Sequence, residues 1–426
     1  MILFFGDSSV QVFAVKCNQP LPHPQKEKLS WLFGDQPLID NTALSGLFYG
    51  PRATMVTPWS TNAVEITQNM GLVGIERIEV YEAKSRVQNP NPMLVTSFDT
   101  LNQKLFEVDL LPETVQQIKD IAAYNEQEGL ALSDEEVSYL EDLASSLKRP
   151  LTDSEVFGFS QVNSEHCRHK IFNGQFIIDG EEKEESLFKL IKNTSKLNPN
   201  SIVSAYKDNV AFIGGPEIEQ FAPQKGDVPS SYKKDTINSV ISLKAETHNF
   251  PTTVEPFNGA ATGSGGEIRD RLAGGQGSIP LAGTAVYMTP YSRVQEDRQQ
   301  SAFPERKWLY QTPIDILIKA SNGASDFGNK FGQPLIAGSL LTFEHKENNE
   351  ILGFDKVIML AGGIGYGKKE QAQKRIPKKG DKIIIVGGYN YRNGMGGAAV
   401  SGADIGVCGS AIELYAVQRS NTKMKK

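Results

Sequence analysis

Hydrophobic and polar residues follow patterns that change along the chain. Near the N-terminus, the short apolar runs 2–5 and 10–15 lie among helical segments, which predicts a small α+β domain. From about residue 86 to 150 the chain is polar with a helical period. A capping box of Ser133 with Glu136 indicates a helix start in this region, and a second one, Thr152 with Glu155, indicates another directly after it.

The second half of the chain is richer in glycine. Residues 216–234 are polar and predict a loop or linker. We expect a helix to begin after Thr312, with proline at its first position, and to stop at Gly323. The apolar run 382–386 predicts a strand that opens a further unit near residue 376. Because the chain ends about 40 residues later, we expect it to be a fragment of a longer protein.

Bulk properties narrow the class of protein. A length of 426 residues suggests two or three domains, and 39% hydrophobic with 22% charged residues is typical of soluble globular proteins. The net charge of −6 argues against a nucleic-acid partner. The sequence has no apolar run of transmembrane length and no signal peptide, so we expect no membrane partner. Its three cysteines, Cys17, Cys167 and Cys408, are far apart, which favours a cytoplasmic location.

Residues 240–248 alternate like a strand. Apolar side chains occupy one face, and Lys244, Glu246 and His248 occupy the other. One interpretation is a site that combines a cation, a carboxylate and an imidazole. The other is the exposed polar face of an edge strand, which is ordinary in sheets.

A glycine-rich stretch follows this strand. We interpret its four glycines, at 259, 263, 265 and 266, as a loop that lets the backbone approach a ligand and point N–H groups at an anion. Glu246 and Asp270 could share a Mg²⁺ ion, and Arg269 suits a phosphate or carboxylate. The alternative is a tight glycine turn with charged residues at the surface.

A second polar cluster lies at residues 163–170. It contains His166 and His169 together with Glu165, Cys167 and Arg168. A metal site, a thiol nucleophile at Cys167 and a polar helix end are all open interpretations, because the spacing matches no zinc or triad pattern.

Three motifs in this order carry a family resemblance. NSEHCRHKIFN at 163–173, ETHNFP at 246–251 and GAATGSGGEIRD at 259–270 closely resemble phosphoribosylformylglycinamidine synthase of the large single-chain type. YGPR at 49–52, TPWS at 57–60 and IERI at 75–78 resemble the first domain of that family. The resemblance runs through the whole chain.

The resemblance implies a multidomain α+β and α/β fold. It divides the chain into a small α+β N-terminal domain (1–130), a helical and extended linker domain (131–194), an ATP-binding domain similar to aminoimidazole ribonucleotide synthetase (195–375) and the truncated start of a second synthetase domain (376–426). The rest of the synthetase and the glutaminase domain would be missing partners, so the fragment is expected to be inactive alone.

The resemblance also implies an activity. The family is an ATP-dependent C–N ligase of purine biosynthesis and a glutamine amidotransferase. It converts formylglycinamide ribonucleotide, ATP and glutamine to formylglycinamidine ribonucleotide, ADP, phosphate and glutamate. ATP phosphorylates the amide oxygen to give an iminophosphate, and ammonia from glutamine displaces the phosphate. The implied cofactors are ATP and Mg²⁺.

Site residues carry over by position. His248 would be the acid/base residue and His166 the second active-site histidine, and Glu246 and Asp270 would hold Mg²⁺. The expected substrate contacts are Thr247, His248, Asn249, Phe250 and Arg269. The expected nucleotide contacts are Gly259, Ala260, Ala261, Thr262, Gly263, Ser264, Gly265, Gly266, Glu267, Ile268, Arg269, Asp270, His169, Lys244, Gly338, Ser339 and Leu340.

Two rival functions stay open. The chain could belong to another member of the same ATP-dependent superfamily, acting on thiamine phosphate, selenide or a carbamoyl group. It could also be a non-catalytic nucleotide-binding protein that kept the motifs.

Overall fold

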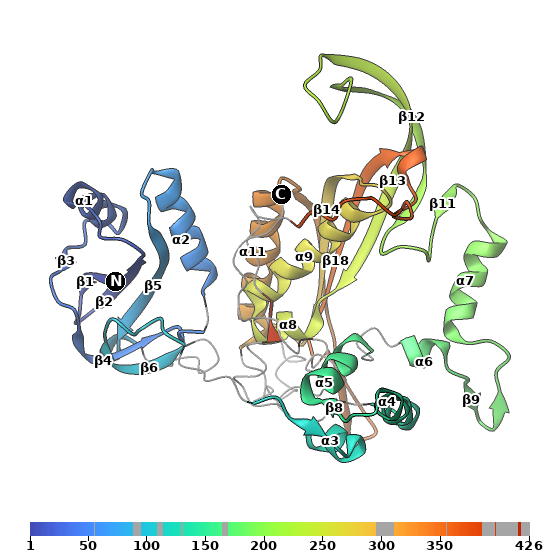
Figure 1. The fold of residues 1–426 in the computed structure, drawn as a ribbon, viewed down its shortest axis with the longest axis horizontal. Coiled ribbons are helices and arrows are strands. Elements are labelled where there is room, and N and C mark those ends of the chain that lie inside the picture. The colour runs from blue at the N-terminus through green and yellow to red at the C-terminus, as the bar shows by residue number, and fades with distance from the viewer. Residues whose placement is uncertain are drawn as a thin grey trace.

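The structure is a computed structural model. It describes residues 1–54, 56–87, 95–108, 114–128, 130, 132–163, 169–294, 311–354, 356–385, 397 and 416–418. Three parts follow one another along the chain: a sheet with two helices, a small helical part, and a larger sheet covered by helices (Figure 1). The predicted multidomain α+β fold is confirmed. The domain boundaries at 130, 194 and 375 stay predictions.

The N-terminal part is an antiparallel sheet in the order β3-β1-β2-β5-β4-β6. Alternation in the predicted runs puts Phe4 and Val12 in one hydrophobic cluster and Phe5 and Val15 in another. The second cluster includes Leu29 of α1, so a helix covers that face of the sheet. The elements are β1 (Ile2–Asp7), β2 (Gln11–Cys17), α1 (His23–Leu32), β3 (Leu38–Ile39), β4 (Leu44–Gly50), α2 (Pro58–Asn69), β5 (Ile75–Ala83), η1 (Lys84–Arg86) and β6 (Thr96–Leu101).

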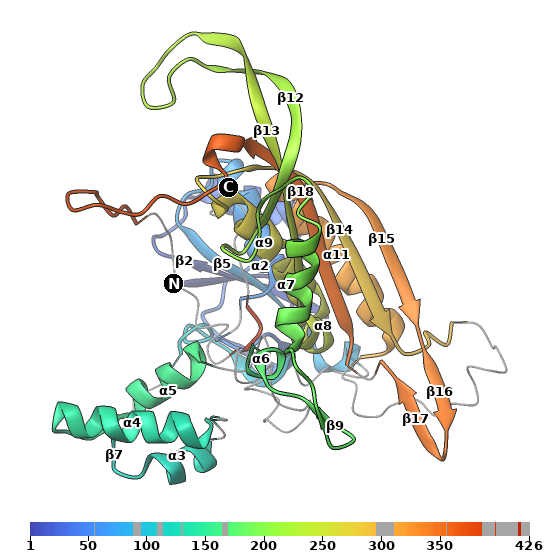
Figure 2. The same cartoon turned by 90° about the vertical axis from the view of Figure 1, so that its right-hand side faces the viewer.

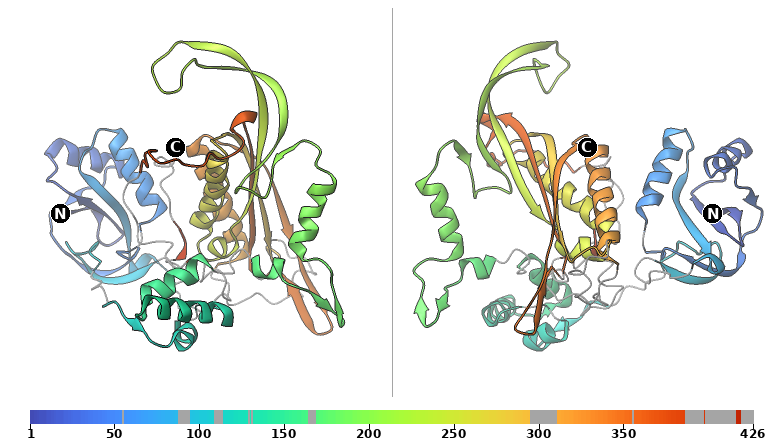
Figure 3. Two further views of the ribbon diagram at one scale, coloured as in Figure 1. Left: turned by 45° about the vertical axis from the view of Figure 1, so that its right-hand side comes forward. Right: turned by 180° about the vertical axis from the view of Figure 1, so that it is seen from behind.

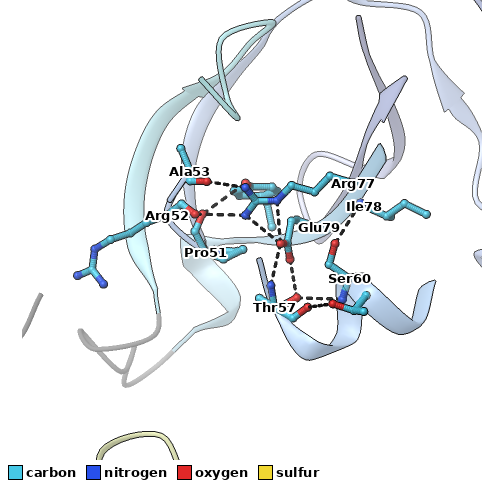
Figure 4. A network of polar contacts seen from close by, with 10 residues as sticks. Pro51, Arg52, Ala53, Thr57, Ser60, Arg77, Ile78 and Glu79 are labelled. Atoms are coloured by element: carbon cyan, nitrogen blue, oxygen red, sulfur yellow. Dashed lines mark hydrogen bonds and ion pairs between the residues drawn. The ribbon is translucent and has the colours of Figure 1, made fainter. Parts of the chain in front are cut away.

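A buried ion pair ties the segment before α2 to strand β5 (Figure 4). Arg77 Nε donates to Glu79 Oε1 at 3.0 Å, and Arg77 Nη1 donates to the Ala53 carbonyl at 2.5 Å. Thr57 Oγ1 donates to the other Glu79 oxygen at 2.6 Å. Burial raises the pKa of Glu79, while the Arg77 charge and the Thr57 hydrogen bonds lower it.

The middle part is built from short helices. Both predicted capping boxes are confirmed, because Ser133 and Thr152 each accept from the backbone three residues on and the glutamates reach back. One hydrophobic cluster joins Ile118, Leu140 and Val156. The elements are β7 (Gln117–Ile118), α3 (Ile121–Glu128), α4 (Asp134–Leu147), β8 (Leu151–Thr152), α5 (Asp153–Val162), α6 (His169–Asn173), β9 (Ile177–Ile178), β10 (Glu181–Glu182) and α7 (Leu187–Leu197).

The larger sheet has the strand order β11-β12-β13-β18-β14-β15. All of its neighbouring strands are antiparallel except β14 and β15. The elements of this part are β11 (Ile202–Ser204), β12 (Ala211–Pro223), β13 (Tyr232–Thr247), α8 (Asn249–Val254), α9 (Pro256–Ala273), β14 (Ile279–Thr289), α11 (Pro313–Phe331), β15 (Leu335–Thr342), β16 (Glu344–Glu347), β17 (Glu350–Gly353), β18 (Ile358–Lys368) and η3 (Lys369–Gln371).

The prediction of a loop at residues 216–234 holds for 224–231 and is wrong for the residues on either side, which belong to strands. Most of this segment belongs to the long hairpin of β12 and β13, which projects away from the rest of the sheet (Figure 2). Its polar composition reflects solvent on both faces, and the rings of Phe221 and Tyr232 pair across the strands at 5.3 Å. Polar residues are compatible with a strand when a neighbouring strand satisfies the hydrogen bonds of the strand's backbone N–H and C=O groups.

Helices α8, α9 and α11 cover one face of this sheet, as the views in Figures 1 and 3 agree. On the opposite face, Ile364 and Leu341 are exposed. The predicted cap Thr312 is confirmed, since its side chain accepts from Asp315 N. The predicted stop at Gly323 is wrong. Helix α11 continues to Phe331, and its left-handed C-cap is Gly332. Gly323 has a packing role instead, since a Cβ at this position would overlap the Phe257 carbonyl.

The predicted strand at 382–386 is also wrong over its described residues. Residues 382–385 have no strand partner in the described chain, and Ile383 is 93% exposed. An apolar run becomes a strand only when a neighbouring strand pairs with it. Within the described residues, no helix is both long and apolar enough to cross a membrane.

Candidate functional site

The glycine-rich stretch 259–270 is helical. The predicted loop is therefore wrong, because helix α9 runs from Pro256 to Ala273 without interruption. Beyond the first turn of a helix, the backbone N–H groups are bonded to carbonyls four residues back. The proposed reason for the glycines, amides pointing at an anion, does not hold.

The glycines instead allow close packing. A Cβ on Gly259 would overlap the backbone of Pro251, and one on Gly263 would lie 2.9 Å from Met359 Sδ. A Cβ on Gly265 would lie 2.6 Å from the Phe327 ring of α11. These contacts bring α9 close to α8, β18 and α11, and so set the distance between α9 and the sheet.

The polar face of β13 meets helix α9. The alternation predicted for residues 240–248 is confirmed up to Thr247, where β13 ends, and His248 lies beyond the strand. β13 lies between β12 and β18 and is not an edge strand. Lys244 Nζ lies 2.7 Å from Asp270 Oδ2 of α9 and 3.3 Å from Glu246 Oε2. The three side chains are partly buried, at 17%, 24% and 31% exposure in the order Lys244, Asp270, Glu246. The structure thus brings together both predicted metal ligands and the predicted nucleotide lysine.

Electrostatics keep this lysine charged. Burial lowers the pKa of Lys244, but the hydrogen bond to Asp270 and the charge of Glu246 outweigh it, and the net shift is upward. Both carboxylates therefore share one ammonium at neutral pH.

Arg269 lies beside the same carboxylates. Burial lowers the pKa of its guanidinium, and the charges of Asp270 and Glu246 oppose that shift. Its Nη1 is buried and has no hydrogen-bond partner among the described residues, and the same holds for Ser264 Oγ. Buried polar groups are normally satisfied, so an unpaired guanidinium nitrogen here suits an anionic ligand.

His248 follows β13 and precedes α8. Its Nδ1 donates to the Gly259 carbonyl at 2.5 Å, because a carbonyl can only accept. In the neutral ring Nε2 is then the nitrogen without a proton. Next to it, Asn249 Oδ1 accepts from Met359 N at 3.0 Å and fixes α8 to β18.

Other predicted ligand residues are inside the protein. Phe250 is 3% exposed, with Lys356 Nζ 5.7 Å from its ring centroid. Ala260 and Ile268 are buried in hydrophobic clusters. Glu267 is 1% exposed and forms an ion pair with Arg271.

The remaining predicted residues are elsewhere or outside the described chain. His169 begins α6, and its ring packs against Phe188 of α7. Gly338, Ser339 and Leu340 lie on β15, with β18 and β14 between that strand and β13. His166, with its neighbours Glu165, Cys167 and Arg168, lies outside the described residues.

Sequence reasoning missed Arg271. It is fully buried, donates to Glu267 through Nε at 2.8 Å and to the Ile364 carbonyl through Nη1 at 2.7 Å, and also contacts Gln333. This network supports α9 directly behind Arg269 and Asp270. The four-residue spacing between Glu267 and Arg271 was the available signal for an ion pair on one helix face.

A divalent cation fits part of this arrangement. Carboxylate oxygens are ligands that Mg²⁺ accepts, and it takes its other ligands from phosphates and water. No group of three or more His, Cys, Asp and Glu side chains in the described part of the chain could hold a metal. Glu246 and Asp270 therefore fit an ion bound together with a phosphate, and not a closed protein cage.

Comparison with family models assigns two ranges within the first 170 of the 426 residues. Residues 10–106 match the formylglycinamide ribonucleotide amidotransferase N-terminal domain, and residues 121–170 match the linker domain of the same enzyme. The fold and these matches define the class, a multidomain α+β protein with amidotransferase domains. Over these two ranges the predicted resemblance to phosphoribosylformylglycinamidine synthase is confirmed.

Solved structures show weaker likeness. "T. maritima PurL complexed with FGAR" is 21% identical with a TM-score of 0.38, over 67% of this chain and 35% of that chain. Phosphoribosylformylglycinamidine synthase II from Thermotoga maritima is 20% identical with a TM-score of 0.29, over 55% of this chain and 27% of that one. AaThiL complexed with AMPPCP and TMP is 12% identical with a TM-score of 0.24, over 42% of each chain. The present chain thus spans about a third of the PurL chain it matches.

Proposed function

We propose that this chain carries part of the ligand site of an ATP-dependent C–N ligase of purine biosynthesis. The reaction is the conversion of formylglycinamide ribonucleotide to the amidine, with ammonia derived from glutamine. The observation that carries this proposal is the convergence of Glu246 and Asp270 on Lys244, in a chain that matches the amidotransferase N-terminal and linker domains. Beside them lies Arg269, whose Nη1 has no hydrogen-bond partner among the described residues. PurL structures with FGAR, ATP and ADP support the choice of ligands.

The carboxylates and cations have separate roles in this proposal. Glu246 and Asp270 would hold Mg²⁺, which when bound neutralises charge on the transferring phosphoryl group. Arg269 would hold a substrate anion, since its buried Nη1 lacks a partner among the described residues. Lys244 would bind a phosphate oxygen of the nucleotide. The contacts expected from residues 259–270, His169 and 338–340 stay part of the proposal.

His248 would move protons. Because Nδ1 donates to the Gly259 carbonyl, Nε2 is the atom that would accept a proton from the attacking ammonia and later return it. The same hydrogen bond holds the ring in one orientation against α9.

His166 would be the second active-site histidine. The proposed location is the cytoplasm.

The test is ADP release from Mg·ATP with formylglycinamide ribonucleotide and ammonium. It is measured with this chain alone and with the chain mixed with the remaining synthetase domains of a large-type synthase. We expect release that depends on the ribonucleotide, and only in the mixture. Release by the chain alone would show that the site is complete within it, and no release from a correctly folded mixture would refute the proposed activity.

The matched variant is His248→Asn. An asparagine amide can keep the donor that Nδ1 supplies to the Gly259 carbonyl, but it lacks Nε2. We expect turnover to fall by about 100-fold or more while nucleotide binding is unchanged. Wild-type turnover in this variant would exclude His248 as the acid/base residue.

The same assay separates the rivals. Release that depends on thiamine phosphate, selenide or a carbamoyl compound in place of the ribonucleotide would favour another superfamily member. Nucleotide binding without turnover on any of these substrates would favour a non-catalytic protein.

A further inference from the structure

Lys244 occupies the space between the two proposed metal ligands. Its ammonium contacts Asp270 Oδ2 at 2.7 Å and Glu246 Oε2 at 3.3 Å, so it already neutralises both partly buried carboxylates. Without it, two like charges would face each other across the strand and the helix, which is unfavourable at partial burial.

The charges around this point balance without a metal. From β13 come Lys244 and Glu246, and from α9 come Arg269 and Asp270. The Glu267–Arg271 pair behind them is neutral as a pair and fully buried. A divalent cation added to this set would bring two further positive charges next to a lysine and an arginine.

Geometry leads to the same conflict. A Mg²⁺ ion binds oxygens at about 2.0–2.1 Å. An ion that bridged the oxygens now in contact with Lys244 Nζ would be pushed against the ammonium. Lys244 is held at this point by ion pairs to the two carboxylates, and 17% of its side chain is exposed to solvent.

We propose that Lys244 and a divalent cation bind the Glu246–Asp270 pair alternately. Lys244 is thus a positioning residue that keeps the carboxylates together before the metal arrives and lowers the affinity of the site for the metal alone. The proposal rests on the metal site of the proposed function. A triphosphate that arrives with the metal would give the displaced ammonium a new partner, so that metal and nucleotide bind more strongly together than apart.

The experiment measures binding of Mn²⁺ without nucleotide, from the loss of the free-ion signal in electron paramagnetic resonance. Lys244→Met removes the charge and keeps most of the aliphatic chain, and we expect it to bind Mn²⁺ at least about tenfold more tightly than the wild type. Lys244→Arg keeps the charge and should bind as weakly as the wild type. Lys234→Met, in the exposed ion pair with Glu219 on the hairpin, is the matched control and should change nothing.

A further variant locates the ion. Asp270→Asn, made in the Lys244→Met background, should abolish the tight binding. Circular dichroism of each variant checks that a loss of binding is not a loss of fold.

The two proposals fail differently. Equal Mn²⁺ affinity in the wild type and Lys244→Met, lost with Asp270→Asn, would overturn the exchange and leave the metal site in place. No binding to any folded variant, or tight binding that survives Asp270→Asn, would overturn the metal site itself. A gain in Lys244→Arg equal to that in Lys244→Met would also overturn the exchange, since charge would not be its cause.

Discussion

Replacing Arg271 by methionine should strongly destabilise helix α9. The variant leaves Glu267, which is 1% exposed, without its cation and with Gln333 as a remaining partner. Breaking a buried ion pair by removing one partner costs about 3–5 kcal/mol. The Ile364 carbonyl also loses its side-chain donor, which adds about 1 kcal/mol.

Hydrogen exchange of the α9 amides measures this effect. A chain of several domains need not unfold in one step, so a local probe is preferable to a single melting curve. The combined loss of about 4–6 kcal/mol in local stability corresponds to exchange roughly 900- to 25,000-fold faster. A change below about fivefold would refute the reasoning, since the pair would then contribute little.

The control is the double variant Glu267→Gln with Arg271→Met. It removes both charges, so no carboxylate is left buried alone, and its exchange should be slower than that of Arg271→Met. Burial raises the pKa of Glu267, and the Arg271 charge lowers it. Without Arg271 the folded-state pKa rises further above the unfolded one. The single variant should therefore regain stability as the pH falls and the carboxyl becomes protonated, and lose it as the pH rises.

Three further predictions follow from burial and hydrogen bonding. Gly259→Ala should cost about 1–3 kcal/mol in the local stability of α9, because its Cβ would overlap the Pro251 backbone. Gly158→Ala, in α5 with nothing within 4 Å of its Cβ, should instead stabilise by about 0.5–1 kcal/mol, and hydrogen exchange of both helices checks the contrast. Burial raises the pKa of Cys17 to about 11, so at pH 8 its alkylation, followed by mass spectrometry, should be at least about 100-fold slower in the native than in the unfolded chain. Because the pKa of Cys17 is raised, the contribution of the neutral thiol to stability is lost as the pH rises toward 11. Equal alkylation rates in the native and the unfolded chain would contradict the burial of Cys17. The Arg149 hydrogen bond, followed by that from Thr152 N, lowers the pKa of Glu155 to about 2, so its contribution should be present above pH 4.5 and lost as the pH falls toward 2. A carboxyl titration by nuclear magnetic resonance that gives a pKa of 4.5 for Glu155, or no rise of that pKa in Arg149→Met, would exclude the ion pair between Glu155 and Arg149.

Local signals in the sequence predicted several elements correctly. The capping boxes at Ser133 and Thr152 and the cap at Thr312 depend only on neighbours within one turn, so they can be recognised without knowledge of the fold. The alternation that points Lys244 and Glu246 to one face of β13 is likewise a local property.

Long-range packing explains what the sequence did not reveal. Glycine has poor helix propensity, so a stretch with four glycines indicates a loop unless a partner requires close approach. The partners here are α8, β18 and α11. The sequence does not reveal that these elements pack against α9. The position of Arg271 against the Ile364 carbonyl depends on β18, almost a hundred residues away, and so could not be predicted from spacing alone.

The glycines of α9 also have a consequence for the order of folding. Each costs about 1 kcal/mol relative to alanine in a helix interior, so this helix has little stability of its own before it packs on the sheet. We expect β13 and β18 to pair first and α9 to gain protection last, which pulse-labelling of amides during refolding can follow. Asp270 then reaches Glu246 only at the end of folding. A cation at this point cannot nucleate the domain as zinc does in a zinc finger, and it would act only by stabilising the finished structure.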